Sequence, residues 1–160
     1  MSYFNNGNIA NCISIIKKSI ISNKKYCNVP FTKSNYYFIH FLYRNGYIES
    51  YKIKNSSNHI ELKFKIYQDK YVLHNITNFF KPGNLNYLNV KKISRLKQQK
   101  NIQTMYILWT SYGFLTLNQT FFRKVGGILV CKLNLRAIKP SKTSVIKFVT
   151  SKITNKVSSP

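Results

Sequence analysis

Isoleucines recur at every third or fourth position near the start of the chain, at Ile9, Ile13, Ile16 and Ile20. This spacing places them on one face of a helix. Asn8 precedes the first isoleucine and is a good N-cap residue. The pattern predicts an amphipathic helix that buries its isoleucine face in a core, as packed helices generally do.

Two further elements are predicted after this helix. Residues 26–31 are apolar and broken by Pro30, which is typical of an edge strand or extended segment. Ser34 is a suitable N-cap for a second helix over residues 35–45, and Gly46 can end that helix in the left-handed conformation. The side chains of this helix that are predicted to face inward are Phe38, Phe41 and Leu42.

The pattern then changes to a period of two. Residues 47–53 form a predicted strand, and residues 54–58 a polar turn. The next apolar positions alternate with polar ones and are Ile60, Leu62, Phe64 and Ile66. After a turn at residues 68–70, residues 71–76 are predicted to return as the partner strand. The first half of the chain is therefore predicted to be an α/β sandwich in which helices cover one face of a three-stranded meander.

The charge of the chain indicates what kind of partner it binds. The chain of 160 residues has 26 Lys and Arg against three acidic residues, and its formal net charge is +23. A free globule with this charge repels itself, so a polyanionic partner is expected, and nucleic acid is the usual one.

The same composition argues against catalysis. The three carboxylates and three histidines show no paired spacing that suits acid–base chemistry. The three cysteines are widely spaced without a CxxC pair, so buried free thiols are expected rather than a zinc site or disulfides. No apolar run approaches the roughly 20 residues that cross a bilayer. We therefore expect no enzyme activity, no cofactor or metal, and no membrane span.

Three stretches carry candidate contact chemistry. Residues 109–131 contain a hydroxyl-rich loop and a Gly-Gly pair, which expose hydrogen-bonding groups and let a partner approach the backbone. Residues 32–34 either bind a phosphate at a helix start or simply cap that helix. Residues 79–83 contain a Pro-Gly turn that marks a domain boundary after residue 78. Together with Tyr87, their aromatic and basic groups either stack on nucleic acid or seal the seam between two domains.

These stretches resemble the family of small-subunit ribosomal protein S8 over residues 9–133. The family's signature is a Ser/Thr-Ser-x-Gly loop followed by two apolar residues, a Thr and, further on, a Gly-Gly pair before the last strand. It is matched by residues 110–116 and 126–127. The segments 29–34, 45–49 and 81–87 match other family positions in the same order. Four ordered matches over most of the chain make the resemblance specific.

The resemblance implies an α/β (α+β) fold of two small domains without catalytic activity. Residues 1–78 are expected to form a helix-strand-helix-strand-strand sandwich, and residues 79–134 an rRNA-binding domain that is mostly β with a short helix. The implied RNA-binding residues are Thr110, Ser111, Tyr112, Gly113, Thr116, Gly126, Gly127, Pro30, Thr32, Lys33, Ser34, Lys81, Pro82, Gly83 and Tyr87. Recognition of structured RNA by shape uses such hydroxyl groups and bare backbone.

Some parts of the chain depart from the family pattern. Trp109 stands where the family usually has Ser, and Ile128 where it usually has Glu. Trp109 either stacks on a base or, as a tryptophan that ends an apolar strand more often does, packs internally. Residues 135–160 continue beyond the family and are basic without an acidic residue. They are expected to be disordered alone and to order against rRNA or a neighbouring protein; the alternative is a dispensable tail.

The resemblance thus implies a structural protein that binds the central domain of small-subunit rRNA and supports subunit assembly and translation. Its expected partners are that rRNA and neighbouring small-subunit ribosomal proteins, with no membrane and no homo-oligomer. The domain begins almost at the first residue without a presequence, and Asn, Lys, Ile, Tyr and Phe dominate as in AT-rich genomes. Both features favour a mitochondrial ribosome, with a plastid or the bacterial cytoplasm as alternatives. The competing function is a free nucleic-acid-binding regulator outside the ribosome.

Overall fold

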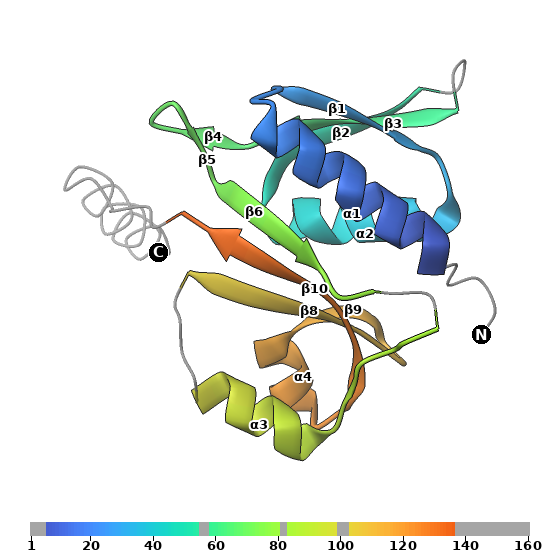
Figure 1. The fold of residues 1–160 in the computed structure, drawn as a ribbon, viewed down its shortest axis with the longest axis vertical. Helices are drawn as coiled ribbons and strands as arrows, with labels where there is room; N and C mark the ends of the chain where they lie inside the picture. The colour runs from blue at the N-terminus through green and yellow to red at the C-terminus, as the bar shows by residue number, and fades with distance from the viewer. Residues whose placement is uncertain (1–5, 55–57, 81–82, 99–102, 137–160) are drawn as a thin grey trace, which may run out of the picture.

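The computed structural model describes residues 6–54, 58–80, 83–98 and 103–136 and combines helices with antiparallel sheets (Figure 1). The helices are α1 (Asn6–Ile21), α2 (Lys33–Arg44), α3 (Val90–Gln98) and α4 (Leu117–Arg123). The strands are β1 (Tyr26–Pro30), β2 (Ile48–Lys54), β3 (His59–Phe64), β4 (Ile66–Tyr67), β5 (Lys70–Tyr71), β6 (Leu73–Asn78), β7 (Tyr87–Leu88), β8 (Thr104–Thr110), β9 (Gly113–Thr116) and β10 (Gly127–Leu135). The α+β class expected from the sequence is confirmed.

The strands form two main sheets and one small hairpin. The first sheet has the order β1-β3-β2, so β1 is an edge strand, as the proline near its end predicted. The second has the order β6-β10-β8-β9, and β7 pairs with β10 beyond the end of β6. β4 and β5 form the hairpin. α1 and α2 lie between the two sheets, whereas α3 and α4 cover the far face of the second sheet (Figure 1).

The main hydrophobic core lies around α1. The isoleucines predicted to face inward are buried, and Ile9, Ile13 and Ile16 have no exposed surface. This core includes residues of both sheets, such as Val29 of β1 and Val130 of β10, so the two halves of the chain share it. A smaller core under α3 and α4 consists of Ile93, Leu108, Leu117 and Leu129. All three cysteines are buried, as expected.

Both N-cap predictions were wrong by a few residues. α1 begins at Asn6, so Asn8 lies inside its first turn. α2 is capped by Thr32, whose extended backbone lets its hydroxyl accept a hydrogen bond from the Asn35 amide at 3.2 Å. Ser34 is instead buried in the first turn. Ser34 cannot be the N-cap, because an N-cap residue has a non-helical backbone and Ser34 lies inside the helix.

The end of α2 follows the prediction. Gly46 has φ +75° and donates its amide to the Tyr43 carbonyl, while the Tyr47 amide reaches back to the Leu42 carbonyl at 3.0 Å. These two hydrogen bonds form a Schellman motif, which needs a left-handed residue that glycine adopts without strain. The chain then enters β2 at Ile48.

The strand predicted over residues 71–76 does not pair with the first sheet, which corrects the meander. β3 already has β1 and β2 as neighbours, so it has no free edge for another strand. Gln68 and Asp69 form the expected turn, with positive φ at both positions. This turn connects only β4 and β5, which have two residues each and pair with one another. β6 then joins β10 in the second sheet. Because the chain leaves β3 after Phe64, Ile66 is 37% exposed rather than buried.

The described residues of the second half contain two helices, where the sequence predicted one short helix. α3 occupies a stretch rich in lysine and arginine and buries Ile93, and α4 follows β9. The placement of the domain boundary after residue 78 stays a prediction, as do the interpretations that fall on residues 55–57, 81–82, 99–102 and 137–160, which lie outside the described residues. Leu135, assigned by sequence to the extension, belongs to β10.

Candidate nucleic-acid interface

The hydroxyl-and-glycine loop is a tight turn between β8 and β9. Thr110 and Gly113 are the last paired residues of these strands. The Thr110 hydroxyl donates to the Gly113 carbonyl at 3.0 Å and accepts from the Tyr112 amide at 3.1 Å. Gly113 has φ +88°, a conformation that suits glycine. Thr110 is buried and therefore braces the turn from inside.

Ser111 and Tyr112 form the tip of this turn and are exposed. The Tyr112 ring is 64% exposed, and the Arg123 guanidinium of α4 lies over it at 5.1 Å from its centroid. A hydroxyl, an aromatic face and a cation are thus presented side by side. Such groups can contact sugar hydroxyls, bases and phosphates respectively.

Thr116 has a structural role at the start of α4. Its hydroxyl accepts from the Gln119 amide, and the Gln119 side chain accepts from the Thr116 amide at 3.0 Å. This reciprocal pair is a capping box, which satisfies two amides that the helix leaves unpaired. Thr116 is 6% exposed, so it fixes the position of α4 relative to the β8–β9 turn.

The Gly-Gly pair allows close approach, but the approaching groups belong to the protein itself. A Cβ at Gly127 would lie 2.6 Å from the Trp109 carbonyl oxygen and 2.8 Å from Cγ2 of Thr110. A Cβ at Gly126 would lie 2.6 Å from the Tyr87 hydroxyl. The pair therefore lets the start of β10 pack closely against the end of β8 and against β7.

Trp109 packs internally, which is the second of the two interpretations left open by the sequence. Its ring meets Phe114 of β9 edge-on with centroids 4.7 Å apart, and it is half-buried against the main core. Ile128 faces Trp109 across the β8–β10 pairing, and it too packs against this core. Two apolar residues that pack against the main core thus stand at the positions where the resemblance led us to expect Ser and Glu.

The segment before α2 is held mainly by helix capping. The Pro30 carbonyl accepts from the Asn35 side chain at 3.0 Å, and Thr32 is the N-cap described above. Ser34 is buried, whereas Lys33 is exposed. Of these residues, Lys33 is the one that presents a charge to solvent.

The Pro-Gly segment is described from Gly83 onward, because Lys81 and Pro82 lie outside the described residues. Gly83 is exposed with φ +85°. Phe80 is 1% exposed, so its ring is packed in the main core and is not presented to solvent. Tyr87 is 56% exposed and borders an open hollow of about 630 Å³ that is also lined by Lys92 of α3.

Sequence reasoning missed a group of residues at the end of α4, which we call the α4 cluster: Phe121, Phe122 and Arg123, with Lys97 of α3. Phe122 is 76% exposed. The Lys97 ammonium lies 3.7 Å from the centroid of Phe121 and 4.9 Å from that of Phe122. The adjacent aromatic and basic residues at positions 121–124 are the signal in the sequence that could have indicated this group.

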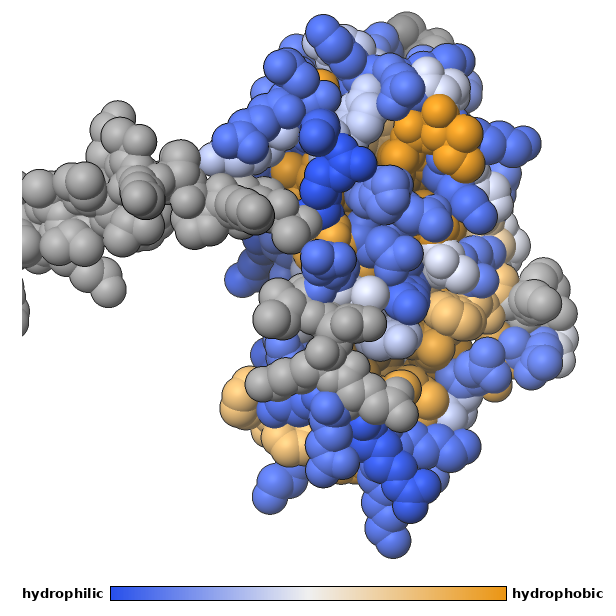
Figure 2. All heavy atoms as spheres, turned by 60° about the vertical axis from the view of Figure 1, so that its left-hand side comes forward, coloured by the Kyte–Doolittle hydropathy of each residue, from blue (hydrophilic) through white to orange (hydrophobic). Residues whose placement is uncertain are grey.

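This surface is strongly positive. No acidic residue follows Asp69 in the chain, so the cations of α3 and α4 have no carboxylate in their own half. Glu49 and Glu61 are engaged on the first sheet by Lys63 and Lys54. Figure 2 shows one face of the molecule, where the lower end formed by α3 is strongly hydrophilic. The exposed cations of α3 are Lys91, Lys92 and Arg95.

Other kinds of site find little support in the part of the chain that the structure describes. Within residues 6–136, less the gaps stated above, no three His, Cys, Asp or Glu side chains gather as a metal site would require. Among the same residues, no helix is long and apolar enough to span a membrane.

Comparison with known proteins agrees with the motifs. Residues 7–134 match the model of the family described as Ribosomal protein S8. The chain is 32% identical to small ribosomal subunit protein uS8m of Acanthamoeba castellanii, covering 79% of this chain and 98% of that protein. It is 29% identical to uS8 of Buchnera aphidicola, covering 77% and 93%, and to uS8c of Tetradesmus obliquus, covering 80% and 98%. Because the family model spans most of the chain and the signature residues build one turn beside α4, this protein belongs to the ribosomal protein S8 family.

Proposed function

We propose that this protein binds the central domain of small-subunit rRNA and thereby supports assembly of the subunit and translation. The observation that carries the proposal is the surface made by the β8–β9 turn and the α4 cluster. There, exposed hydroxyl, aromatic and basic groups lie together in a half of the chain that has no carboxylate. Membership of the family supports it, because the relatives are named as small ribosomal subunit proteins.

Affinity and register come from different groups in this proposal. The cations of α3 and α4 neutralise phosphates and release counterions, which supplies sequence-independent affinity. The Ser111 hydroxyl and the backbone around Gly113 contact 2′-hydroxyl and phosphate groups, which sets the position of the protein on the RNA. The turn is suited to this role because Thr110 holds it rigidly from inside.

The proposed contact residues differ in how far they are exposed, and this suggests different roles. Those with an exposed surface touch the RNA directly: Ser111, Tyr112, Lys33, Gly83 and Tyr87. Those that are buried hold the contact residues in place: Thr110, Thr116, Ser34 and Gly127. The half-buried residues Pro30, Thr32, Gly113 and Gly126 border the first group. Lys81 and Pro82 remain proposed contacts.

The compartment and partners follow from the same reasoning. We infer that the protein works in a mitochondrial ribosome, since the Acanthamoeba relative carries the suffix of mitochondrial forms and the residue bias points to an AT-rich genome. Neighbouring small-subunit proteins complete its surroundings. Mass spectrometry of purified mitochondrial ribosomes tests this placement, and recovery of the protein only outside them would contradict it.

Binding of the full chain to two RNAs tests the function. We expect a central-domain fragment of the small-subunit rRNA to bind more tightly than an unrelated hairpin of equal length at about 200 mM salt, where purely non-specific binding weakens sharply. Equal affinity for the two RNAs would overturn the proposal. Tight binding to an mRNA structure without binding to the rRNA fragment would favour the regulator instead.

Two variants locate the contact surface. Ser111→Ala and Tyr112→Ala are expected to weaken binding of the fragment, because these side chains form the exposed tip of the turn. Ser14→Ala is a matched control, since Ser14 is an exposed serine of α1 whose hydroxyl donates to the Ala10 carbonyl of its own helix. Unchanged affinity in both turn variants would remove the turn from the interface.

A further inference from the structure

A group of aromatic side chains lies on α2 and β2, outside the signature motifs. We call it the tyrosine cluster: Tyr36, Tyr37, His40 and Tyr43 of α2, with Tyr51 of β2. Tyr51 is its centre, because its ring meets those of Tyr36, His40 and Tyr43 edge-on at 5.5–6.2 Å. The Tyr51 hydroxyl is also hydrogen-bonded to Nδ1 of His40 at 3.0 Å. These contacts hold the rings in a fixed arrangement.

The cluster is more exposed than a core requires. Tyr37 is 58% exposed and Tyr43 47%. Tyr36, Tyr43 and Tyr51 border an open hollow of about 420 Å³, together with Ser50 and Ile53. Single exposed apolar residues are ordinary, but a contiguous patch of rings around a hollow usually marks a binding surface. The hollow is open to solvent, so a ligand there would lie against the rings rather than inside a closed pocket.

The surroundings of the hollow are positive. Arg44 is exposed and lies on α2 one turn after His40 of the cluster. The two carboxylates of the first sheet are already engaged by lysines: Glu61 by Lys54 at 2.9 Å, and Glu49 by Lys63. A ligand that carries negative charge beside flat rings therefore complements this surface.

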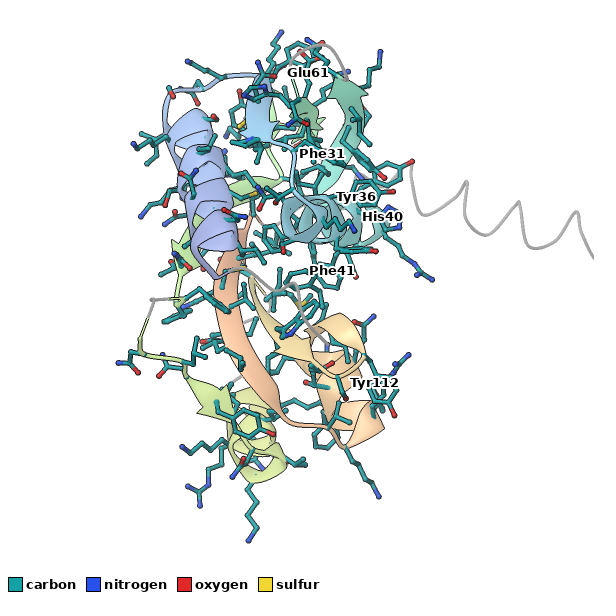
Figure 3. All side chains as sticks on the ribbon, turned by 90° about the vertical axis from the view of Figure 1, so that its right-hand side faces the viewer. Phe31, Tyr36, His40, Phe41, Glu61 and Tyr112 are labelled. Carbon is teal, nitrogen blue, oxygen red and sulfur yellow. The ribbon has the colours of Figure 1, made fainter. Side chains whose placement is uncertain are left out.

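The cluster continues towards the proposed rRNA surface. Figure 3 shows Tyr36 and His40 above Phe41, and Tyr112 below it, along one side of the molecule. Phe41 and Phe38 of α2 meet Phe114 of β9 with ring centroids 6.0 and 5.3 Å apart, so α2 is joined directly to the strand that leaves the β8–β9 turn. α2 is therefore an element of the first half of the chain that packs next to this turn.

We propose that the tyrosine cluster binds unpaired nucleotides of RNA by stacking them on Tyr43 and its neighbours, with Arg44 neutralising a phosphate beside them. This rests on the proposed function in its choice of RNA as ligand, and it adds a second contact that recognises unpaired rather than helical RNA. Aromatic platforms beside cations bind single strands in this way, because every base offers a flat face.

The test uses the full chain and two probes: the central-domain rRNA fragment, and a single-stranded RNA of about ten nucleotides, a length typical of small single-strand binding modules. Tyr43→Leu is expected to weaken binding of the single strand roughly 5- to 150-fold, as loss of one stacked base does. The slope of affinity against salt stays unchanged because no charge is removed. Tyr43→Phe keeps the ring and is expected to bind nearly as well as the original protein.

Tyr26→Leu is the matched control, because Tyr26 is a 54% exposed tyrosine on β1, at the opposite edge of the same sheet. It is expected to leave binding unchanged. Ultraviolet crosslinking of the unaltered protein to the single strand, read by mass spectrometry, gives an answer even where a variant folds poorly. Crosslinks at Tyr36, Tyr43 or Tyr51 support the proposal, and crosslinks confined to Tyr112 and Phe122 overturn it.

The outcomes separate the two proposals. If the fragment outcompetes the unrelated hairpin but Tyr43→Leu binds the single strand as well as Tyr26→Leu does, only the tyrosine cluster is wrongly assigned. If the fragment shows no preference while the single strand still depends on Tyr43, only the rRNA assignment fails. A glutamate-rich peptide that binds through Tyr43, with single-strand binding unaffected by Tyr43→Leu, would assign the hollow to a protein partner and overturn the proposal.

Discussion

Gly127 of β10 lies against Thr110 of the neighbouring strand β8, so that a Cβ added at Gly127 would come within 2.8 Å of the threonine methyl group and 2.6 Å of the Trp109 carbonyl oxygen. The same threonine holds the β8–β9 turn through its hydroxyl. The glycine of β10 and the brace of the turn are therefore in contact, and the position of β10 determines how the exposed tip is supported.

Gly127→Ala is expected to destabilise the protein by about 1–3 kcal/mol, the usual effect of forcing an extra carbon into packed surroundings. The atoms in the way include backbone, which cannot rotate aside. Urea denaturation measures the change. A variant as stable as the original protein would contradict the close packing of β10 against β8.

At Gly113, asparagine is expected to be less destabilising than alanine, which is the reverse of the order expected at Gly127. The φ of Gly113 is +88°, but a Cβ there would meet nothing within 4 Å. Gly113→Ala should therefore lose about 1–2 kcal/mol through backbone strain alone, whereas Gly113→Asn should lose less because asparagine tolerates left-handed conformations. At Gly127 the larger Asn should be worse than Ala. Thermal melts of the four variants check this reversal.

Thr116→Ala is expected to destabilise the protein by about 1 kcal/mol, because it removes the hydroxyl half of the capping box of α4. Thr116→Ser keeps the hydroxyl and should restore most of the stability. If urea denaturation finds Thr116→Ser as unstable as Thr116→Ala, the lost methyl contact rather than the cap is responsible.

Local patterns predicted the elements whose structure depends on near neighbours. The isoleucine spacing of α1, the proline near the end of β1, the glycine that ends α2 and the alternation in β3 each act within a few residues. The choice of the neighbouring strand in a sheet, in contrast, depends on residues that are distant in the sequence. Residues 71–76 carried a clear strand pattern, but whether they joined β3 or β10 depended on β1 and β2 having already taken both edges of β3. α3 was hidden because six of its nine residues are polar or basic around the buried Ile93.

The contact residues stay a prediction, and the structure shows only how the sequence motif is built. The signature motif located the β8–β9 turn, yet it did not distinguish residues that face solvent from those that hold the turn. Thr110 and Ser111 are neighbours with the same chemistry, but one is 5% exposed and the other lies at the tip. The tyrosine cluster joins residues of α2 to Tyr51 through tertiary packing, so no stretch of sequence displays it.

The three cysteines should be inert in the folded protein. Burial raises the pKa of the Cys12, Cys27 and Cys131 thiols above their ordinary value, so the reactive thiolate is scarce at neutral and mildly alkaline pH. We expect no alkylation by iodoacetamide without denaturant and three alkylated sites in guanidinium, counted by mass spectrometry. Rapid labelling of the native protein at any of these positions would show that α1 opens away from the sheets.

Arg123 should contribute a single phosphate contact if the surface binds RNA as proposed. Its guanidinium lies over the exposed Tyr112 ring at the tip of the turn, in a half of the chain where no carboxylate can pair with it. Arg123→Gln is therefore expected to reduce the slope of log affinity against log salt for the rRNA fragment by about 1. Lys17→Gln removes the same charge from an exposed position on α1, away from this surface, and should leave the slope unchanged. Equal slopes for both variants would mean that Arg123 acts only through the overall charge of the protein, because a direct phosphate contact releases counterions that a distant charge does not.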